Sequence, residues 1–179
     1  MSGCNYLVTG GAGFIGINLV KRLLAQNPNN RISVVDNFWK WADRSARMFT
    51  DHRVVTFDLD LLHPSSQFDS ILSGIDVVFH LADVVGGINY VFGNEFDVMS
   101  RNACIDSNVF RAVALAKIPK LVYVGTACSY PQGRQAANSK DFIFKENEVL
   151  PADPESGYGW SKLYGELMAE KLSDSGVEV

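Results

Sequence analysis

Short apolar runs alternate along the chain with longer stretches in which apolar residues recur every three or four positions. The short runs are typical of buried strands, and the longer periodic stretches are typical of helices packed on one side. We expect strands at residues 5–9, 31–36, 53–57, 76–80 and 121–124, and helices at 14–26, 64–72, 89–116 (one helix or two) and 157–172. Residues 176–179 resemble the start of a further strand. This alternation predicts an α/β fold, a doubly wound parallel sheet in a three-layer αβα arrangement.

A glycine-rich turn, Thr9–Gly16, joins the first predicted strand to the first predicted helix. Gly10 and Gly13 allow the backbone to approach a pyrophosphate, and Gly16 allows the helix to pack close to the strand. The free N–H groups and the positive dipole end of the helix then face the phosphates. Glycine turns also serve as plain turns. Here a strand precedes, a helix follows, and Asp36 comes about twenty residues later, which is the order of a dinucleotide-binding fold.

Asp36 ends the second predicted strand. A carboxylate there can accept both hydroxyls of an adenosine ribose and would repel a 2′-phosphate, which favours NAD over NADP as the cofactor. Lys40, Arg44 and Arg47 follow nearby and keep NADP as a less favoured alternative. The other interpretation of Asp36 is the N-cap of a helix. The polar and aromatic stretch at residues 37–51 would cover the adenosine or pack on a partner.

Further residues of interest follow the later strands, at the edge where a doubly wound sheet binds its ligand. Asp58 and Leu59 follow the third strand, where the adenine edge would lie, and residues 81–83 follow the fourth, where small side chains would admit the cofactor. We interpret His80 as a hydrogen-bonded residue at a strand end rather than as a catalyst. Asn102, on the apolar face of a predicted helix, indicates a structural hydrogen bond to a neighbouring strand or loop.

Tyr158 and Lys162 are four residues apart and therefore lie on one face of a predicted helix. The ammonium group and the positive charge of an oxidised nicotinamide would together lower the pKa of the phenol towards neutrality, so that Tyr158 works as a base. Thr126, at the end of the fifth strand, would hydrogen-bond a substrate hydroxyl or carbonyl oxygen and align it with Tyr158. The alternative is an exposed tyrosine and lysine on an ordinary helix.

The composition argues against several classes of protein. The chain has 179 residues, 47% hydrophobic and 20% charged, which is enough for one compact domain with its own core. Its net charge of −4 and its scattered basic residues argue against nucleic acid or a lipid surface as a partner. No stretch resembles a membrane span or a signal peptide. Cys4, Cys104 and Cys128 have neither disulfide nor metal-ligand spacing, so we expect no metal site and a cytoplasmic protein.

These motifs, in this order, resemble the extended short-chain dehydrogenase/reductase family, in particular its NAD-dependent nucleotide-sugar epimerases and dehydratases. The resemblance covers nearly the whole chain. It implies a Rossmann fold and a tightly held nicotinamide that takes a hydride from a sugar carbon and later returns it. It also implies Tyr158 as the base, Lys162 as its partner and ribose clamp, and Thr126 as the hydroxyl partner. The cofactor-binding residues implied by the motifs are Gly10, Gly13, Phe14, Ile15, Gly16, Asp36, Asn37, Asp58, Leu59, Leu81, Ala82, Tyr158 and Lys162.

Two further stretches narrow the resemblance to enzymes that act on GDP-sugars. Residues 85–88 and 126–131 look like the corresponding stretches of the GDP-mannose 3,5-epimerases and GDP-L-fucose synthases. This resemblance implies that Cys128 is an acid/base for epimerisation beside a sugar ketone, where a thiolate can remove the acidified C–H proton. A 4,6-dehydratase would carry an Asp-Glu pair after the threonine, so dehydration is disfavoured. The implied substrate-binding residues are Gly86, Gly87 and Thr126.

Several alternatives remain beside this interpretation. The chain could be a nucleotide-sugar 4-epimerase or a reductase of the same family, or a non-catalytic NAD-binding fragment, and Cys128 could be a small buried filler. Enzymes of the resembled family are much longer, and their second part supplies the nucleotide-sugar pocket and the opposite acid/base, a lysine or histidine. We therefore expect residues 1–179 to form a truncated NAD-binding domain that turns over poorly by itself and exposes a sheet edge. The resemblance also implies a homodimer formed through the long helices.

Overall fold

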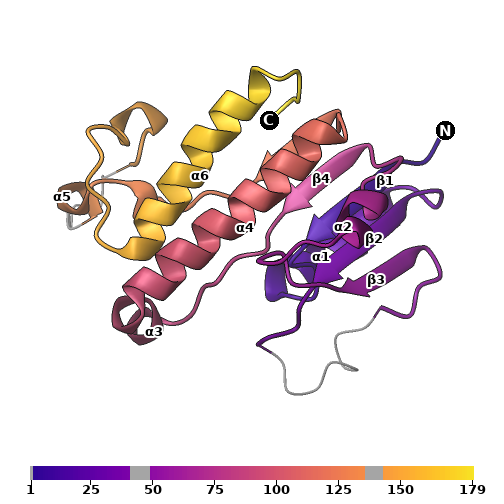
Figure 1. Ribbon diagram of the computed structural model, residues 1–179, viewed down its shortest axis with the longest axis horizontal. Helices are drawn as coiled ribbons and strands as arrows, with labels where there is room; N and C mark the ends of the chain where they lie inside the picture. Colours follow the sequence, from indigo (N-terminus) through magenta and orange to yellow (C-terminus); the bar gives the residue numbers. More distant parts are fainter. Residues whose placement is uncertain (1, 41–48, 136–142) are drawn as a thin grey trace.

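The computed structural model describes residues 2–40, 49–135 and 143–179. Its centre is one parallel sheet. The strands are β1 (Asn5–Thr9), β2 (Arg31–Asp36), β3 (Val54–Asp58), β4 (Val77–His80) and β5 (Lys120–Tyr123). Their order in the sheet is β3-β2-β1-β4-β5, so the chain adds two strands on one side of β1 and then two on the other (Figure 1). The doubly wound parallel sheet predicted from the sequence is confirmed.

Helices connect the strands and follow the last of them. They are α1 (Phe14–Gln26), α2 (Ser66–Ile71), α3 (Ile88–Gly93), α4 (Glu95–Leu115), α5 (Gln132–Gln135) and α6 (Gly157–Ser173), with the short 3-10 turns η2 (Ala127–Ser129) and η3 (Glu146–Glu148). The long helical stretch after β4 forms two helices, and the break between them lies at Asn94. There the Asn94 side chain donates a hydrogen bond to the Tyr90 carbonyl at 2.8 Å and so satisfies one of the last carbonyls of α3.

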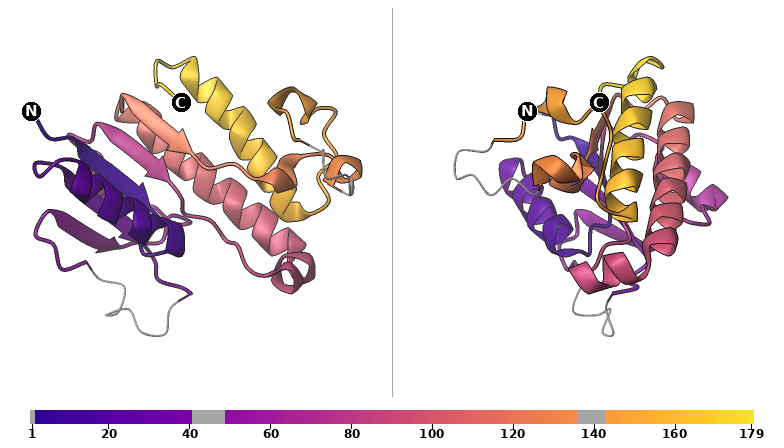
Figure 2. Two further views of the ribbon diagram at one scale, coloured as in Figure 1. Left: turned by 180° about the vertical axis from the view of Figure 1, so that it is seen from behind. Right: turned by 90° about the vertical axis from the view of Figure 1, so that its left-hand side faces the viewer.

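The two faces of the sheet are covered by different helices (Figure 2). Successive side chains of a strand point to opposite faces, so Leu7 and Val8 of β1 enter separate clusters of the core. Leu7 packs with α2, α4 and α6, and this cluster is the larger one. Val8 packs with Val20 and Leu23 of α1 on the opposite face. The sheet is therefore buried on both sides around β1, as an all-parallel sheet requires.

Two buried polar side chains hold the centre of the fold, as the sequence predicted. His80 ends β4, with its Nδ1 2.6 Å from the hydroxyl of Thr9 and its Nε2 3.0 Å from Asp106 Oδ1. Asn102 of α4 accepts a hydrogen bond from the Val84 N–H at 2.7 Å and donates one to the Val84 carbonyl at 3.1 Å. Asn102 thereby fixes the loop that leaves β4. The structural interpretations of His80 and Asn102 are both confirmed.

The last residues of the chain run beside β5. Glu178 forms a parallel bridge with Lys120. The Leu121 N–H donates to the Glu178 carbonyl at 2.8 Å, and the Glu178 N–H donates to the Pro119 carbonyl at 2.9 Å. The predicted strand at residues 176–179 is thus represented by an isolated bridge, and no strand is assigned there in the described residues.

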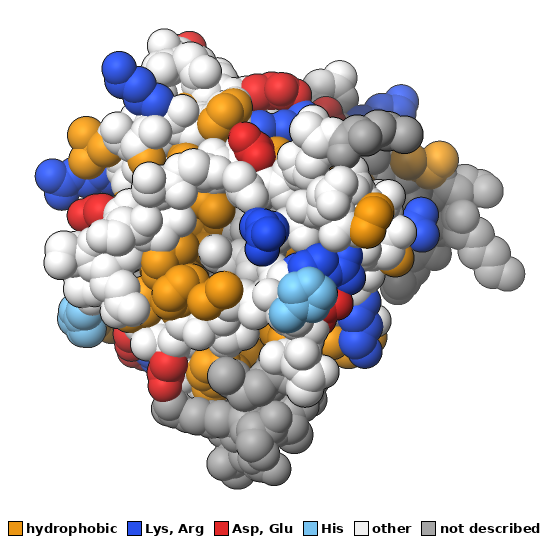
Figure 3. Space-filling view, turned by 90° about the vertical axis from the view of Figure 1, so that its right-hand side faces the viewer, with side chains coloured by type: hydrophobic (Ala, Val, Ile, Leu, Met, Phe, Trp, Pro, Cys, Tyr) orange, Lys and Arg blue, Asp and Glu red, His pale blue; other side chains and the backbone are white. Residues whose placement is uncertain are grey.

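The surface carries charges of both signs. Figure 3 shows one face of the molecule, on which acidic, basic and hydrophobic side chains all occur. None of the helices in the described parts of the chain is long and apolar enough to cross a membrane. Cys4, Cys104 and Cys128 are free thiols, which agrees with their unpaired spacing.

Candidate functional site

A cavity of about 420 Å³ opens at the carboxyl ends of the parallel strands. Its walls come mainly from the segments at and after the ends of the five strands and from α1, α4 and α6. Asp58 is a predicted cofactor residue that does not line this cavity, and its side chain is exposed at the end of β3. The roles of the others stay predictions, but the fold brings them to one place. The predicted cofactor residues that line the cavity are Gly10, Gly13, Phe14, Ile15, Gly16, Asp36, Asn37, Leu59, Leu81, Ala82, Tyr158 and Lys162.

The glycine loop after β1 packs too closely on its surroundings for side chains. Gly10 has a φ of +66°, in the left-handed region that favours glycine. A Cβ atom on Gly10 would lie 2.7 Å from the backbone nitrogen of Ala82, and one on Gly16 would lie 2.5 Å from the Cα of Gly11. Both distances are shorter than van der Waals contact. The backbone of this loop therefore forms the floor of the cavity directly.

Helix α1 begins at the same loop with its first turn open to a ligand. Gly13 is its N-cap, and no side chain caps the helix there. Phe14 and Ile15, in the first turn, are 80% and 60% exposed. The N–H groups of a first helical turn have no partner within the helix, and the helix dipole makes this end positive. An uncapped helix start at a cavity suits an anionic group such as a pyrophosphate.

Asp36 closes β2 and binds the glycine loop. Its Oδ2 accepts a hydrogen bond from the Ala12 N–H at 3.0 Å, and its Oδ1 accepts one from the Phe38 N–H at 2.8 Å. Burial raises the pKa of the Asp36 carboxyl, the two backbone hydrogen bonds lower it, and the charge of Asp58 raises it. Asp36 caps none of the described helices, so the N-cap interpretation is wrong. The carboxylate instead links the end of β2 to the glycine loop after β1.

Lys162 lies on α6 with its amine inside the molecule. Its residue is 4% exposed. The Nζ atom lies 4.1 Å from the centroid of the Tyr123 ring and 3.4 Å from Asp83 Oδ2. Tyr123 in turn donates its hydroxyl to Asp106 Oδ2 at 2.7 Å, which fixes the ring beneath the lysine. The ammonium group is therefore held by a cation–π contact and by one buried carboxylate.

Tyr158 lies one helical turn before Lys162, and its ring is half-buried. Burial raises the pKa of its phenol above the usual value of about 10, and the negative charge of Asp83 raises it further. An interaction with the hydroxyl of Thr126 acts in the opposite direction. The sequence predicted a pKa lowered by Lys162 together with an oxidised nicotinamide. In the protein without a cofactor the pKa is raised, first because the phenol is desolvated and second because of the negative charge of Asp83. The lowering expected with a bound oxidised nicotinamide stays a prediction.

Thr126 and Cys128 lie beside Tyr158, at the start of η2. The Thr126 hydroxyl accepts a hydrogen bond from the Cys128 N–H at 3.2 Å. The Cys128 carbonyl lies only 2.2 Å from where a Cβ atom on Gly159 would stand, so η2 packs directly on the first turn of α6. This contact brings Cys128 next to the residue that follows Tyr158. Neither Thr126 nor Cys128 lines the cavity itself, and their predicted roles stay predictions.

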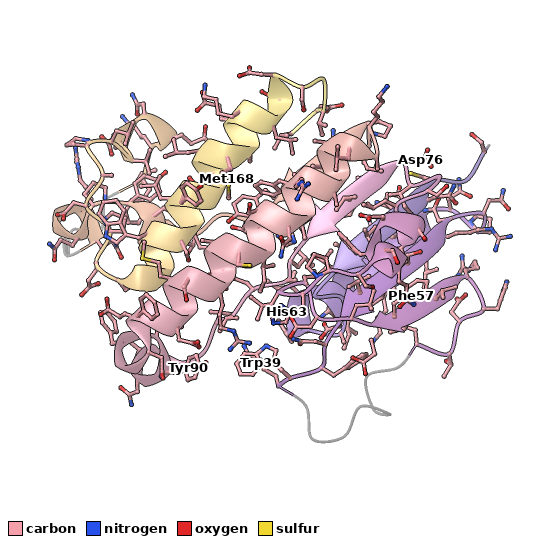
Figure 4. The ribbon with its side chains drawn as sticks, in the orientation of Figure 1. Trp39, Phe57, His63, Asp76, Tyr90 and Met168 are labelled. Carbon is pink, nitrogen blue, oxygen red and sulfur yellow. The ribbon has the colours of Figure 1, made fainter. Side chains whose placement is uncertain are left out.

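Gly86 and Gly87, predicted to bind substrate, also lie outside the cavity lining. Both are exposed, and Gly87 is the N-cap of α3. The Tyr90 ring of α3 packs on Trp39 from the loop after β2, with ring centroids 6.2 Å apart (Figure 4). Trp39 does line the cavity. This ring pair connects the second glycine turn to the cofactor side of the site.

Some cavity residues were missed from the sequence. Asp83 belongs to the stretch 81–83, for which the sequence pattern predicts only small side chains that admit the cofactor. The signal that could have identified Asp83 is a carboxylate shortly after an apolar strand. Arg101 lines the cavity from α4, and nothing in its sequence context indicated this. Lys40 lines the cavity as well, whereas Arg44 and Arg47, which kept NADP open, lie outside the described residues.

The fold and the cavity together define a Rossmann-type α/β domain. The cavity lies where the strand order changes direction, between β1 and β4, which is the usual ligand position of such sheets. The chain belongs to the NAD-dependent epimerase/dehydratase family, whose family model matches residues 6–179. The expected resemblance is confirmed at the level of the family.

Similar proteins are sugar-nucleotide enzymes that are about twice as long as this chain. GDP-mannose 3,5-epimerase 1 of Oryza sativa subsp. japonica is 28% identical over 172 residues, which cover 96% of this chain and 43% of that protein. The structure of UDP-glucuronic acid 4-epimerase from Bacillus cereus, in complex with UDP-glucuronic acid and NAD, is 26% identical and covers 95% of this chain and 52% of its own, with a TM-score of 0.76. The structure of UDP-N-acetylglucosamine 4-epimerase from Methanobrevibacter ruminantium M1 has a TM-score of 0.80 at 23% identity, covering 99% of this chain and 53% of its own.

Proposed function

We propose that this chain is the NAD-binding part of a nucleotide-sugar epimerase that resembles the 3,5-epimerases of GDP-sugars. The observation that carries the proposal is that Tyr158 and Lys162 line the same cavity as the glycine loop after β1. A cofactor held by that loop would share its pocket with a tyrosine–lysine pair, which suits transfer of a hydride and a proton at a sugar C–OH group. When bound, NAD supplies the reversible hydride transfer. The chain's own residues would bind the sugar and move the proton.

The residues of the cavity fit NAD. The uncapped start of α1 and the bare backbone at Gly10 and Gly13 suit the pyrophosphate. Asp36 suits the adenosine ribose hydroxyls and would repel a 2′-phosphate, which supports NAD over NADP. Lys162 would hold the other ribose. Tyr158 would act as the base, with Thr126 as its hydroxyl partner.

We expect NAD to bind clearly more tightly than NADP, and Asp36→Asn to remove much of that difference. The substitution keeps the shape and one acceptor of the side chain but removes the negative charge. NAD should weaken by about tenfold, since a charge-assisted hydrogen bond contributes about 1.5–3 kcal/mol. NADP should weaken less or improve. Calorimetric titration of both cofactors on both proteins measures this, and equal wild-type affinities for NAD and NADP would contradict the role given to Asp36.

The GDP-sugar specificity and the 3,5-epimerisation rest on Cys128 and on the relatives. Two relatives named GDP-mannose 3,5-epimerase are 28% identical to this chain. Cys128 lies next to the residue that follows Tyr158, which supports its role as an acid/base for a C–H group next to the carbon that Tyr158 serves. The chain spans about half the length of these relatives, so the activity is proposed for the protein to which this domain belongs.

Incubation of the protein with NAD and GDP-mannose in D₂O tests the reaction. A 3,5-epimerase removes a proton from carbon and replaces it from solvent, so deuterium should enter the sugar, and Cys128→Ser should slow this exchange. Epimerisation without deuterium uptake would favour the 4-epimerase alternative, because that hydride returns to the carbon it left. Net change of NAD to NADH would favour a dehydrogenase or reductase. NAD binding without any reaction would favour a non-catalytic NAD-binding fragment.

We also propose a homodimer formed through α4 and α6, as the resemblance implies. These helices pack side by side on one face of the sheet (Figure 1). Side chains of both helices line an apolar groove. The groove includes Phe110, Leu167 and Met168, and Leu167 is 45% exposed. An exposed apolar groove on a pair of long helices supports a contact with a second copy. Light scattering would then report twice the mass of one chain.

The three free thiols support our proposal of a cytoplasmic location.

A further inference from the structure

Asp83 is a buried carboxylate inside the proposed cofactor cavity. It follows β4, lines the cavity, and its side chain is 12% exposed. Its Oδ2 lies 3.4 Å from Lys162 Nζ. Its Oδ1 is buried and accepts no hydrogen bond from the described residues. A buried carboxylate normally has each oxygen compensated, so the protein alone leaves part of this negative charge unbalanced.

The groups around Asp83 compensate its negative charge only in part. Lys162 is its cation partner, and that single contact is longer than a good charge-assisted hydrogen bond. Asp106 adds a second negative charge, which His80 and Tyr123 bind by hydrogen bonds. Burial has the largest effect and raises the pKa of the Asp83 carboxyl, so that the pKa stays above its usual value. Lys162 and His80 lower this pKa, and the charge of Asp106 raises it. An additional positive charge beside the unbonded Oδ1 would therefore stabilise the Asp83 carboxylate.

We propose that Asp83 makes this site prefer the oxidised nicotinamide cofactor, NAD⁺, over NADH. The inference rests on the proposed function, because it requires a nicotinamide in the pocket of Tyr158 and Lys162. An oxidised nicotinamide ring carries one more positive charge than a reduced one. A carboxylate in a buried pocket attracts that charge strongly because the effective dielectric constant there is low. Asp83 thus acts on the redox state of the cofactor, not on the substrate.

This preference would also control the base. The charge of Lys162 is offset by Asp83, so the pair by itself gives Tyr158 little positive field. The additional charge of NAD⁺ would supply that field, and NADH would not. Tyr158 would therefore gain its basic character together with the cofactor form that accepts a hydride.

Asp83→Asn tests the proposal through binding affinities. Asparagine keeps the size of the side chain and removes the charge. We expect NAD⁺ to bind about tenfold more weakly relative to NADH in the variant, which corresponds to about 30 mV in the potential of a two-electron couple. ADP-ribose, which lacks the nicotinamide, should bind with unchanged affinity and shows that the variant is folded. Asp60→Asn is the matched control, since Asp60 also lines the cavity and should leave the NAD⁺/NADH ratio unchanged.

The outcomes separate the two proposals. If the wild-type protein binds none of the three ligands, the proposed function fails and this inference fails with it. If all three bind and Asp83→Asn leaves the NAD⁺/NADH ratio unchanged, this inference alone is overturned. An equal loss of affinity for all three ligands would assign Asp83 a structural role and would also overturn it. A fall in the ratio with unchanged ADP-ribose binding supports it.

Discussion

Gly10→Ala is expected to remove most NAD binding and to destabilise the fold. Gly10 has a φ of +66°, and an added Cβ would lie 2.7 Å from the Ala82 nitrogen and 2.8 Å from the Ala82 Cα. Left-handed backbone contributes about 1–2 kcal/mol of strain for a residue with a Cβ, and overpacking adds about 1–3 kcal/mol. We expect the free energy of unfolding to fall by about 3 kcal/mol. The loop must move to relieve the contact, so NAD affinity should fall by roughly a hundredfold.

Urea denaturation and calorimetric titration with NAD measure the two effects of Gly10→Ala. Gly93→Ala is the matched control, because a Cβ at this last residue of α3 would meet no atom within 4 Å. It should leave the stability within about 0.5 kcal/mol and the NAD affinity unchanged. Wild-type affinity in Gly10→Ala would contradict the close packing of the glycine loop on the segment after β4.

The fold could be predicted from the sequence because its signals are local. The apolar run at residues 31–36 and the periodic stretch at 14–26 each carry the pattern of one element, and both match β2 and α1. The boundaries shift where the pattern is weak. The third strand was expected at 53–57 and is Val54–Asp58, and the second helix was expected at 64–72 and is Ser66–Ile71, since Ser65 caps it.

The gathering of most predicted cofactor residues around one cavity was also predictable, because a parallel sheet brings its strand ends to one edge. Gly10, Asp36 and Ala82 each lie at or just after the end of a strand, so the topology alone brings them to one edge. Tyr158 and Lys162 share a helix face through their spacing. Asp58 also ends a strand but does not line the cavity. Position at a strand end fixes the neighbourhood of a residue, whereas the direction of its side chain depends on the local backbone.

The position of Asp83 beside Lys162 and the raised pKa of Tyr158 could not be predicted from the sequence. Their environment depends on a contact between the loop after β4 and α6, which are far apart in sequence. No spacing rule connects Asp83 to Lys162, and the sequence showed only a lysine that would assist a tyrosine. The resemblance gave Thr126 and Cys128 their expected roles. A resemblance to a family predicts the order of functional residues along the chain. Their distances from one another and from the cavity depend on how the elements pack.

Lys162→Met is expected to lower the free energy of unfolding by about 3 kcal/mol at about pH 7, because removing one partner of a buried ion pair leaves an uncompensated charge. Asp83 would then be buried beside methionine with no cation. Its pKa in the folded state would rise further above the unfolded value of about 4. A carboxyl whose pKa is raised by folding costs no stability below its unfolded pKa. The cost grows as the pH rises from the unfolded to the folded pKa and is complete above the folded pKa. The destabilisation should therefore shrink as the pH falls from about 7 towards about 4.

Urea denaturation at several pH values, on single and double variants, separates charge from packing in this effect. Lys162→Met combined with Asp83→Asn removes both charges and should recover most of the lost stability, because the two residues interact directly. Lys171→Met, on the exposed side of the same helix, should change nothing measurable, since its ion pair with Glu170 is exposed. A loss in Lys162→Met that is equal at all pH values and persists in the double variant would come from the lysine methylenes packed near Tyr123. It would contradict a buried carboxylate that needs a cation at this site.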